Sequence, residues 1–129
     1  MFNHDLLNPA LHELLMRVRH TNTIIISDKG FPFWPAIETI DISLADDQPS
    51  VLHVLKVILP HFTVGKCWMA EQFNSWNEED IKNSFNEVLK DISREFEDHD
   101  EFKKRVPRAI GLIRTGGTAS YSNIILESA

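Results

Sequence analysis

A histidine and an aspartate flank the most β-branched segment of the chain. His20 lies just before residues 23–26 (Thr-Ile-Ile-Ile), and Asp28 lies just after them. Such a run is typical of a buried strand, and ligand sites in α/β proteins gather at strand ends. An imidazole that titrates near neutrality suits proton transfer. The two ends of one strand are too far apart for direct contact, so His20 would reach a shared pocket from the side of a helix or from a neighbouring subunit.

Both residues also have structural interpretations. His20 could stabilise the dipole in the last turn of a preceding helix. Asp28 could organise a turn together with Gly30. The spacing alone favours these interpretations over catalysis.

Apolar periodicity predicts helices alternating with strands around these residues. Helices are expected over residues 9–20, 51–58, 78–94 and 99–105, and strands over residues 23–27, 38–42, 62–70, 109–114 and 123–127. The alternation predicts a three-layer α/β fold. Because no repeat or linker interrupts it, we expect one domain over residues 1–129.

Composition and charge narrow the class of protein. The chain is 43% hydrophobic and 25% charged, as in ordinary globular proteins, and its net charge of −6 argues against a nucleic-acid surface. No apolar run approaches the roughly 18 residues of a membrane span, and His4 and Asp5 stand where a signal peptide would be basic and then apolar. Cys67 is the single cysteine, which suits a reducing compartment. We therefore expect a cytoplasmic protein without membrane or nucleic-acid partners.

Motifs for metals and nucleotides are absent. The six histidines form no HExxH or paired Cys/His pattern, and residues 115–118 (Thr-Gly-Gly-Thr) lack the spacing of a phosphate loop. We therefore expect neither a metal site nor a cofactor. Phe31, Phe33 and Trp34 form an aromatic loop that could stack on a sugar or contact another subunit.

In order and spacing, several segments resemble the D-ribose pyranase and L-fucose mutarotase family over nearly the whole chain. The matching segments are Arg19–Asn22, Ser27–Pro32, Ile40-Asp41, Pro49–Leu52, Ile113–Gly116 and Tyr121–Leu126. The final Tyr-x-Asn-Ile-Ile-Leu after an Arg-Thr-Gly turn is the most specific of them.

The resemblance implies a cofactor-free sugar mutarotase with a three-layer α/β/α fold, assembled into homo-oligomeric rings whose sites lie at subunit interfaces. It implies that His20 is the proton donor. It also implies that the sugar hydroxyls are bound by Asp28, His99, Tyr121, Ser122 and Asn123. Histidine at position 99 is the ribose type and arginine the fucose type, which favours D-ribose over L-fucose or another aldose. In the family, the C-terminal Tyr/Asn segment reaches a neighbour's pocket.

The chain departs from the family pattern in the bulkier loop Phe33–Pro35, in the absence of a short tail beyond the last strand, and at two single positions. Gly117 stands where an acidic residue is usual, and Arg19 where glycine is common. The loss of the acidic residue motivates a second hypothesis, a non-catalytic sugar-binding or regulatory oligomer with the same fold. A third is an interaction module that uses the aromatic loop.

Overall fold

Five strands of the chain run parallel, and one strand in the middle of the sheet runs against them. The computed structural model describes all 129 residues, and its six-stranded sheet has the order β2-β5-β1-β6-β3-β4. The strands are β1 (Thr23–Ser27), β2 (Glu38–Asp41), β3 (Val64–Ala70), β4 (Ser93–Glu97), β5 (Gly111–Arg114) and β6 (Ile124–Ser128). Only β6 is antiparallel, and it pairs with β1 on one side and β3 on the other.

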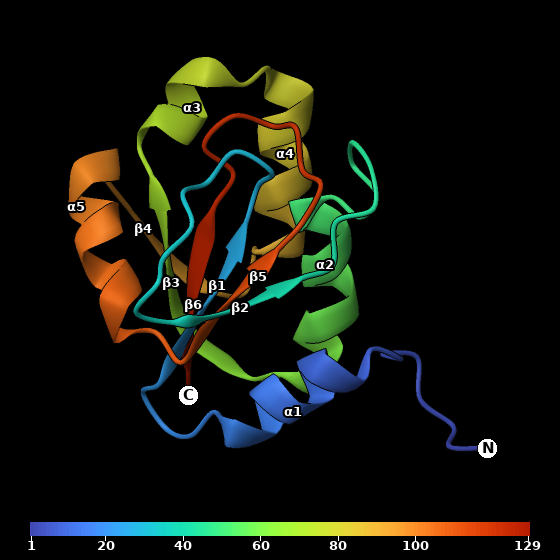
Figure 1. Cartoon of the computed structure of the whole chain (residues 1–129). Helices are drawn as coiled ribbons and strands as arrows, with labels where there is room; N and C mark the ends of the chain where they lie inside the picture. The colour runs from blue at the N-terminus through green and yellow to red at the C-terminus, as the bar shows by residue number, and fades with distance from the viewer.

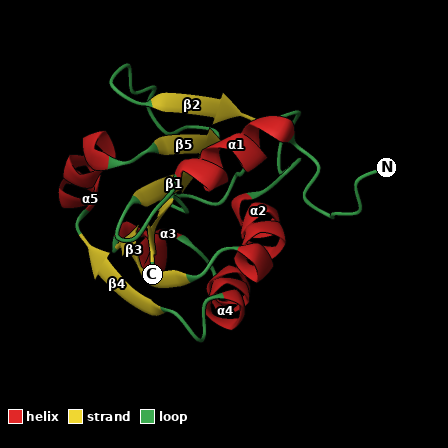
Figure 2. Cartoon of the chain, turned by 90° about the horizontal axis from the view of Figure 1, so that it is seen from below, coloured by secondary structure: helices red, strands yellow, loops and turns green.

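Helices cover both faces of this sheet (Figure 1). They are α1 (Pro9–Arg17), α2 (Val51–Ile58), α3 (Gln72–Trp76), α4 (Glu79–Val88) and α5 (His99–Arg105), with short 3₁₀ turns η1 (Leu59–His61) and η2 (Val106–Arg108). Residues of α1, α2 and α4 form one apolar core with one face of the sheet, and α5 with η2 forms a second core on the other face. Figure 2 shows the sheet between α5 and the α2–α4 pair, so the expected three-layer α/β/α fold is confirmed.

The first two helices begin where capping residues predict. The Asn8 side chain accepts hydrogen bonds from the backbone N–H groups of Ala10 and Leu11 at the start of α1. Ser50 likewise accepts one from His53 at the start of α2. None of the helices combines the length and apolarity needed to cross a membrane.

The first helix is shorter than expected. It ends at Arg17, and His20 lies in a turn closed by a hydrogen bond from the Asn22 N–H to the Arg19 carbonyl. Thr21 in this turn has a φ of 65°. Because His20 lies beyond the helix end, its interpretation as a residue of the last helical turn is wrong.

The helix expected over residues 78–94 is also too long. It ends at Val88, and the next residues lead into β4, which pairs in parallel with β3. Leu89 and Ile92 continue the helical spacing of apolar residues and both pack in the core, although neither is helical. Strand β4 and the five-residue helix α3 were not expected, whereas the other strands begin and end within two residues of their predicted bounds.

Candidate active site

Four of the residues expected to bind sugar come together at one edge of the sheet. Since β6 is antiparallel, its beginning meets the ends of β1 and of the other parallel strands (Figure 1). Asp28 follows β1, His99 follows β4, and Tyr121 and Asn123 precede β6. With the segment 30–32 and Ser120 they line a cavity of about 250 Å³, which we call the Asp28 pocket.

The carboxylate of Asp28 is half-buried in this pocket. Its Oδ1 accepts a hydrogen bond from the Gly30 N–H at 3.0 Å, and its own backbone N–H donates to Oδ1 of Asn123 at 2.8 Å. Burial raises the pKa of Asp28 above its ordinary value, against the opposing effects of the Gly30 and Phe31 N–H groups, Asn123 and Arg114. Asp28 is thus a carboxylate made more basic by its surroundings.

Arg114 holds the loop that follows Asp28. Its guanidinium donates to the carbonyl oxygens of Phe31 at 2.7 Å, Pro32 at 3.3 Å and Lys29 at 3.4 Å. Phe31 is buried against Phe102, with ring centroids 6.1 Å apart, so the loop is fixed from both sides. Phe31 therefore forms part of the core and cannot contribute to an exposed aromatic surface.

His99 faces Asp28 from the first turn of α5. Its backbone N–H donates to Oε1 of Gln72 at 3.0 Å, and its ring meets the Tyr121 ring edge-on with centroids 5.0 Å apart. Burial lowers the pKa of His99, and the charge of Lys103 lowers it further. The pocket therefore combines a carboxyl group of raised pKa with an imidazole that is mostly neutral near neutral pH.

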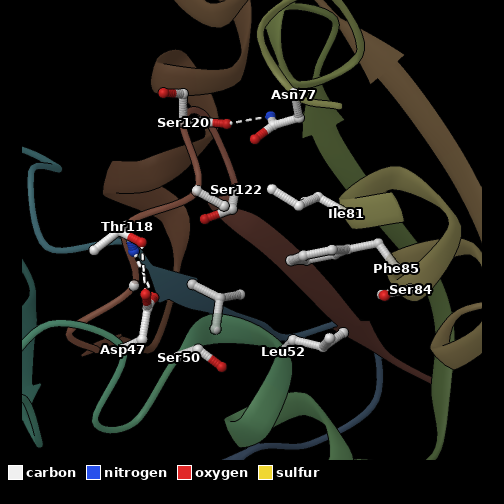
Figure 3. A pocket seen from close by; sticks show the side chains of 13 residues that line it. Asp47, Ser50, Leu52, Asn77, Ile81, Ser84, Phe85, Thr118, Ser120 and Ser122 are labelled. Carbon is white, nitrogen blue, oxygen red and sulfur yellow. Dashed lines mark hydrogen bonds between the residues drawn. The ribbon is translucent and has the colours of Figure 1, made fainter. Parts of the chain in front are cut away.

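The loop that carries Tyr121 is tied down at both ends. Thr118 donates to the Asp47 carboxylate through its N–H and its hydroxyl, and the Asn77 amide donates to the Ser120 carbonyl at 2.8 Å (Figure 3). Tyr121 has a φ of 54°, a left-handed conformation that is costly for a residue with a side chain. These anchors maintain the turn that presents Tyr121 to the pocket.

The side chain of Ser122 lies outside the Asp28 pocket. It is fully buried, its hydroxyl has no hydrogen-bond partner, and it lines a cavity of about 340 Å³ on the other side of the loop (Figure 3). The only titratable group in that larger cavity is Asp47, which is already bonded to Thr118. We therefore take the smaller cavity, with Asp28 and His99, as the candidate active site.

His20 lies at the opposite edge of the sheet. Its turn precedes β1, and the neighbouring Thr21 N–H donates to the carbonyl of Ser128 at the far end of β6. The length of β1, at about 3.3 Å per residue, separates it from Asp28 by roughly 16 Å. Within one chain, His20 therefore cannot contact a molecule held by Asp28. By contrast, Tyr121 and Asn123 line the pocket of their own chain, contrary to the expectation that they reach a neighbour's.

Gly117 and Arg19, the two single positions that depart from the family pattern, both take part in backbone hydrogen bonding. The carbonyl of Gly117 accepts the Lys29 N–H, and a Cβ at this position would lie 3.1 Å from atoms of Val51 and Thr115. A side chain at position 117 would thus face the larger cavity. Arg19 lies just beyond the end of α1, and its side chain donates to the carbonyls of Met16 and Val18.

Two residues that organise the site were not singled out from the sequence. Arg114 was noted only as part of a motif, and Gln72, which positions His99 and also donates to Asp98, was not noted at all. The Arg-Thr-Gly turn after a strand could have drawn attention to Arg114. Gln72 lies in the unexpected helix α3 and carries no such pattern.

Comparisons with known proteins place this geometry in context. The profile of the RbsD / FucU transport protein family matches residues 1–129. The D-ribose pyranase of Bacillus cytotoxicus is 34% identical over 128 residues, which are 99% of this chain and 97% of the relative. The structure of Bacillus subtilis RbsD complexed with D-ribose is 30% identical with a TM-score of 0.92, covering 100% of this chain and 98% of that one. The fucose mutarotase of Streptococcus pneumoniae in complex with L-fucose, at 19% identity, shares the fold with a TM-score of 0.80 over 95% of this chain and 92% of its own.

Proposed function

The chain belongs to the RbsD / FucU family, and we propose that it is a sugar mutarotase, an isomerase that interconverts ring forms or anomers of a free aldose. D-ribose is the favoured substrate, because relatives that are at least 30% identical include D-ribose pyranases and an RbsD complexed with D-ribose. L-fucose or another aldose is the alternative. We place the activity in the cytoplasm, where free monosaccharides would be its substrates.

The single observation that carries this proposal is the pairing of Asp28 with His99 in one small pocket. Ring opening breaks the anomeric O–H bond and the bond between the anomeric carbon and the ring oxygen, and the ring oxygen takes up a proton. The Asp28 carboxylate, whose pKa is raised by burial, is suited to accept the anomeric proton. His99, kept neutral, can exchange hydrogen bonds with a hydroxyl without adding charge. The reaction needs only proton transfer, so no cofactor is required.

Tyr121 and Asn123 complete the proposed sugar site from the β6 side. The phenol of Tyr121 and the amide of Asn123 are hydrogen-bonding groups that suit a polyol. A volume of about 250 Å³ lies just below the usual range of small-molecule pockets, which fits a monosaccharide better than a nucleotide. Ser122 could take part only through its backbone, because its side chain faces the other cavity.

His20 enters this proposal as the proton donor from a second copy of the chain. Since it lies at the other edge of its own sheet, a homo-oligomer that brings the turn at residues 19–22 of one subunit to the Asp28 pocket of the next would complete the site. A ring of subunits repeats this contact at every interface. The exposure of His20 in the single chain is consistent with such a contact.

Saturation-transfer NMR on the anomeric protons of D-ribose tests the reaction directly. With catalytic amounts of the protein, exchange between pyranose and furanose forms should be faster than in buffer, and L-fucose and other aldoses serve as comparison substrates. Acceleration of another sugar alone would keep the mechanism and change the substrate. If no sugar exchanges faster, the mutarotase proposal fails.

Subunit mixing tests the shared site. His20→Ala and Asp28→Asn subunits should each be inactive alone, but co-refolded in equal amounts they should recover roughly a quarter of the wild-type rate. This follows because each site draws its two residues independently from two subunits. A mixture as inactive as its parents would place His20 outside the site. Wild-type protein taken through the same refolding procedure gives the reference rate.

A non-catalytic sugar-binding oligomer is the second candidate, motivated by Gly117. A side chain at that position would face the larger cavity and would not enter the Asp28 pocket, so its loss leaves the proposed catalytic groups in place. This favours the enzyme. Sugar binding by titration without any acceleration of exchange would instead identify the binding protein.

A further inference from the structure

A cluster of histidines far from the Asp28 pocket carries a separate inference. The segment before α1 lies against η1, so that Asp5 Oδ1 is 2.7 Å from Nε2 of His61 and 3.5 Å from Nδ1 of His4. One ligand atom from each of these three residues lies within 4.8 Å of the others. The His12 ring, on α1, is 4.9 Å from the His4 ring between centroids.

We propose that His4, Asp5 and His61 bind a zinc ion. Zinc binds histidine nitrogen and carboxylate oxygen at about 2.0–2.2 Å, so two ligands of a tetrahedral site lie about 3.4 Å apart. The separations of 2.7 and 3.5 Å around Asp5 lie on either side of this value. Small side-chain rotations would therefore bring the three groups to a common centre, with water as the fourth ligand.

The ligand types select the class of metal. Two imidazoles with one carboxylate suit zinc and its late first-row neighbours, whereas Mg²⁺ and Ca²⁺ prefer oxygen ligands throughout. The carboxylate of Asp5 offsets part of the charge of the ion. The chain as a whole has a net charge of −6, which further favours a bound cation.

The hydrogen bonds that now hold the cluster can be exchanged for metal bonds. Nδ1 of His4 accepts the Leu6 N–H at 3.0 Å, and coordination through this nitrogen would replace that bond. Coordination through Nε2 of His61 would replace its hydrogen bond to Asp5, and the single ring proton would then reside on Nδ1. His12 Nε2 is bonded to the Leu6 carbonyl, so this ring is held beside His4 and supports its orientation.

The proposed metal would connect two distant parts of the chain. His4 and Asp5 precede α1, whereas His61 ends the η1 turn that leads from α2 into β3. Since β3 is parallel to β1, its beginning lies at the edge of the sheet opposite the Asp28 pocket. Within one chain, zinc would thus fix the N-terminal segment without contacting the Asp28 pocket.

Calorimetric titration of ZnCl₂ into the full, untagged, metal-stripped chain tests the site. We expect one zinc per chain, and a Co²⁺-substituted sample should give the visible absorption of a four- or five-coordinate histidine site. His61→Gln and Asp5→Asn should each weaken zinc binding at least tenfold. His53→Gln is the matched control, because His53 is an exposed histidine outside the cluster, and it should bind zinc as the wild type does.

Thermal unfolding separates loss of the site from loss of the fold. At the same zinc concentration, the Tm of the wild type and of His53→Gln should rise clearly more than that of His61→Gln. Without metal, the Tm of His61→Gln should stay close to that of the wild type, because the residue is exposed. Absence of stoichiometric binding, or equal weakening by His53→Gln and His61→Gln, would overturn the proposal.

Discussion

Oδ1 of Asn123 accepts a hydrogen bond from the backbone N–H of Asp28 at 2.8 Å, across 95 residues of sequence. The bond joins the start of β6 to the end of β1. A second hydrogen bond comes from the residue that follows β5: the Thr115 hydroxyl donates to the Ser27 carbonyl at 2.8 Å. The position of the Asp28 carboxylate is therefore set by three strands together.

Replacing Asn123 by alanine should weaken both the fold and the activity. The partly buried Asp28 N–H would lose its acceptor, and the cost should lie toward the low end of the about 1–3 kcal/mol of a fully buried unpaired donor. Urea unfolding measures this loss, and ribose exchange should slow in the same variant. Ser120→Ala keeps the backbone carbonyl that accepts from Asn77, so its stability should stay within about 0.5 kcal/mol of the wild type. Equal stability of the two variants would show that the Asn123 bond contributes nothing.

The variant Asp28→Asn should lose most of the ring-exchange activity. An amide has nearly the shape of the carboxylate but cannot accept a proton, and general-base catalysis is typically worth about 100- to 10,000-fold. Saturation-transfer NMR on ribose gives the rate. Sugar binding measured by calorimetry should persist, although more weakly. A wild-type rate in this variant would remove Asp28 from the mechanism.

The same variant should be more stable than the wild type near neutral pH. The pKa of Asp28 is raised by burial above its ordinary 3.8, so the folded state holds this proton more tightly than the unfolded state. Ionisation therefore destabilises the fold fully above the raised pKa, and the penalty vanishes as the pH falls below 3.8. Urea unfolding from pH 7 to pH 3.5 should show the advantage of Asp28→Asn shrinking with acid. A constant difference would contradict this account.

Gly116→Ala should destabilise the loop beside the site. A Cβ at this position would lie 2.0 Å from the backbone carbonyl oxygen of Ala45, a contact that only movement of the chain can relieve. Such overpacking costs about 1–3 kcal/mol. Gly65→Ala is the control, since its Cβ would meet Ala129 at an ordinary 3.4 Å. Thermal unfolding should show a lower Tm for Gly116→Ala alone.

The sheet was largely predictable because its central strands are apolar on both faces. The isoleucines of β1 and β6 have no helical periodicity, and turn residues bound both segments. β4 is the outermost strand on one side of the sheet. It alternates exposed residues with half-buried Arg94 and Phe96, so its pattern of apolar residues is weak. Because Leu89 and Ile92 fit a helical stripe, the sequence favoured a longer helix there.

The candidate site was predictable only in its residue types. Asp28 and Asn123 stand at strand ends in the sequence, but their contact depends on β6 running antiparallel. The position of His20 could not be deduced, since the length of the preceding helix decides it. The cluster of His4, Asp5 and His61 forms no sequence motif, because His61 lies 56 residues after Asp5 along the chain.

The order of the strands has a consequence for how the protein is made. β6 occupies the middle of the sheet, yet the ribosome synthesises it after all five other strands. Without β6, no strand pairing of this sheet would join β2, β5 and β1 to β3 and β4. Their facing edges are then open to other nascent chains. The pairing of β6 with β1 and β3 is thus the step that both closes the sheet and covers these two strands.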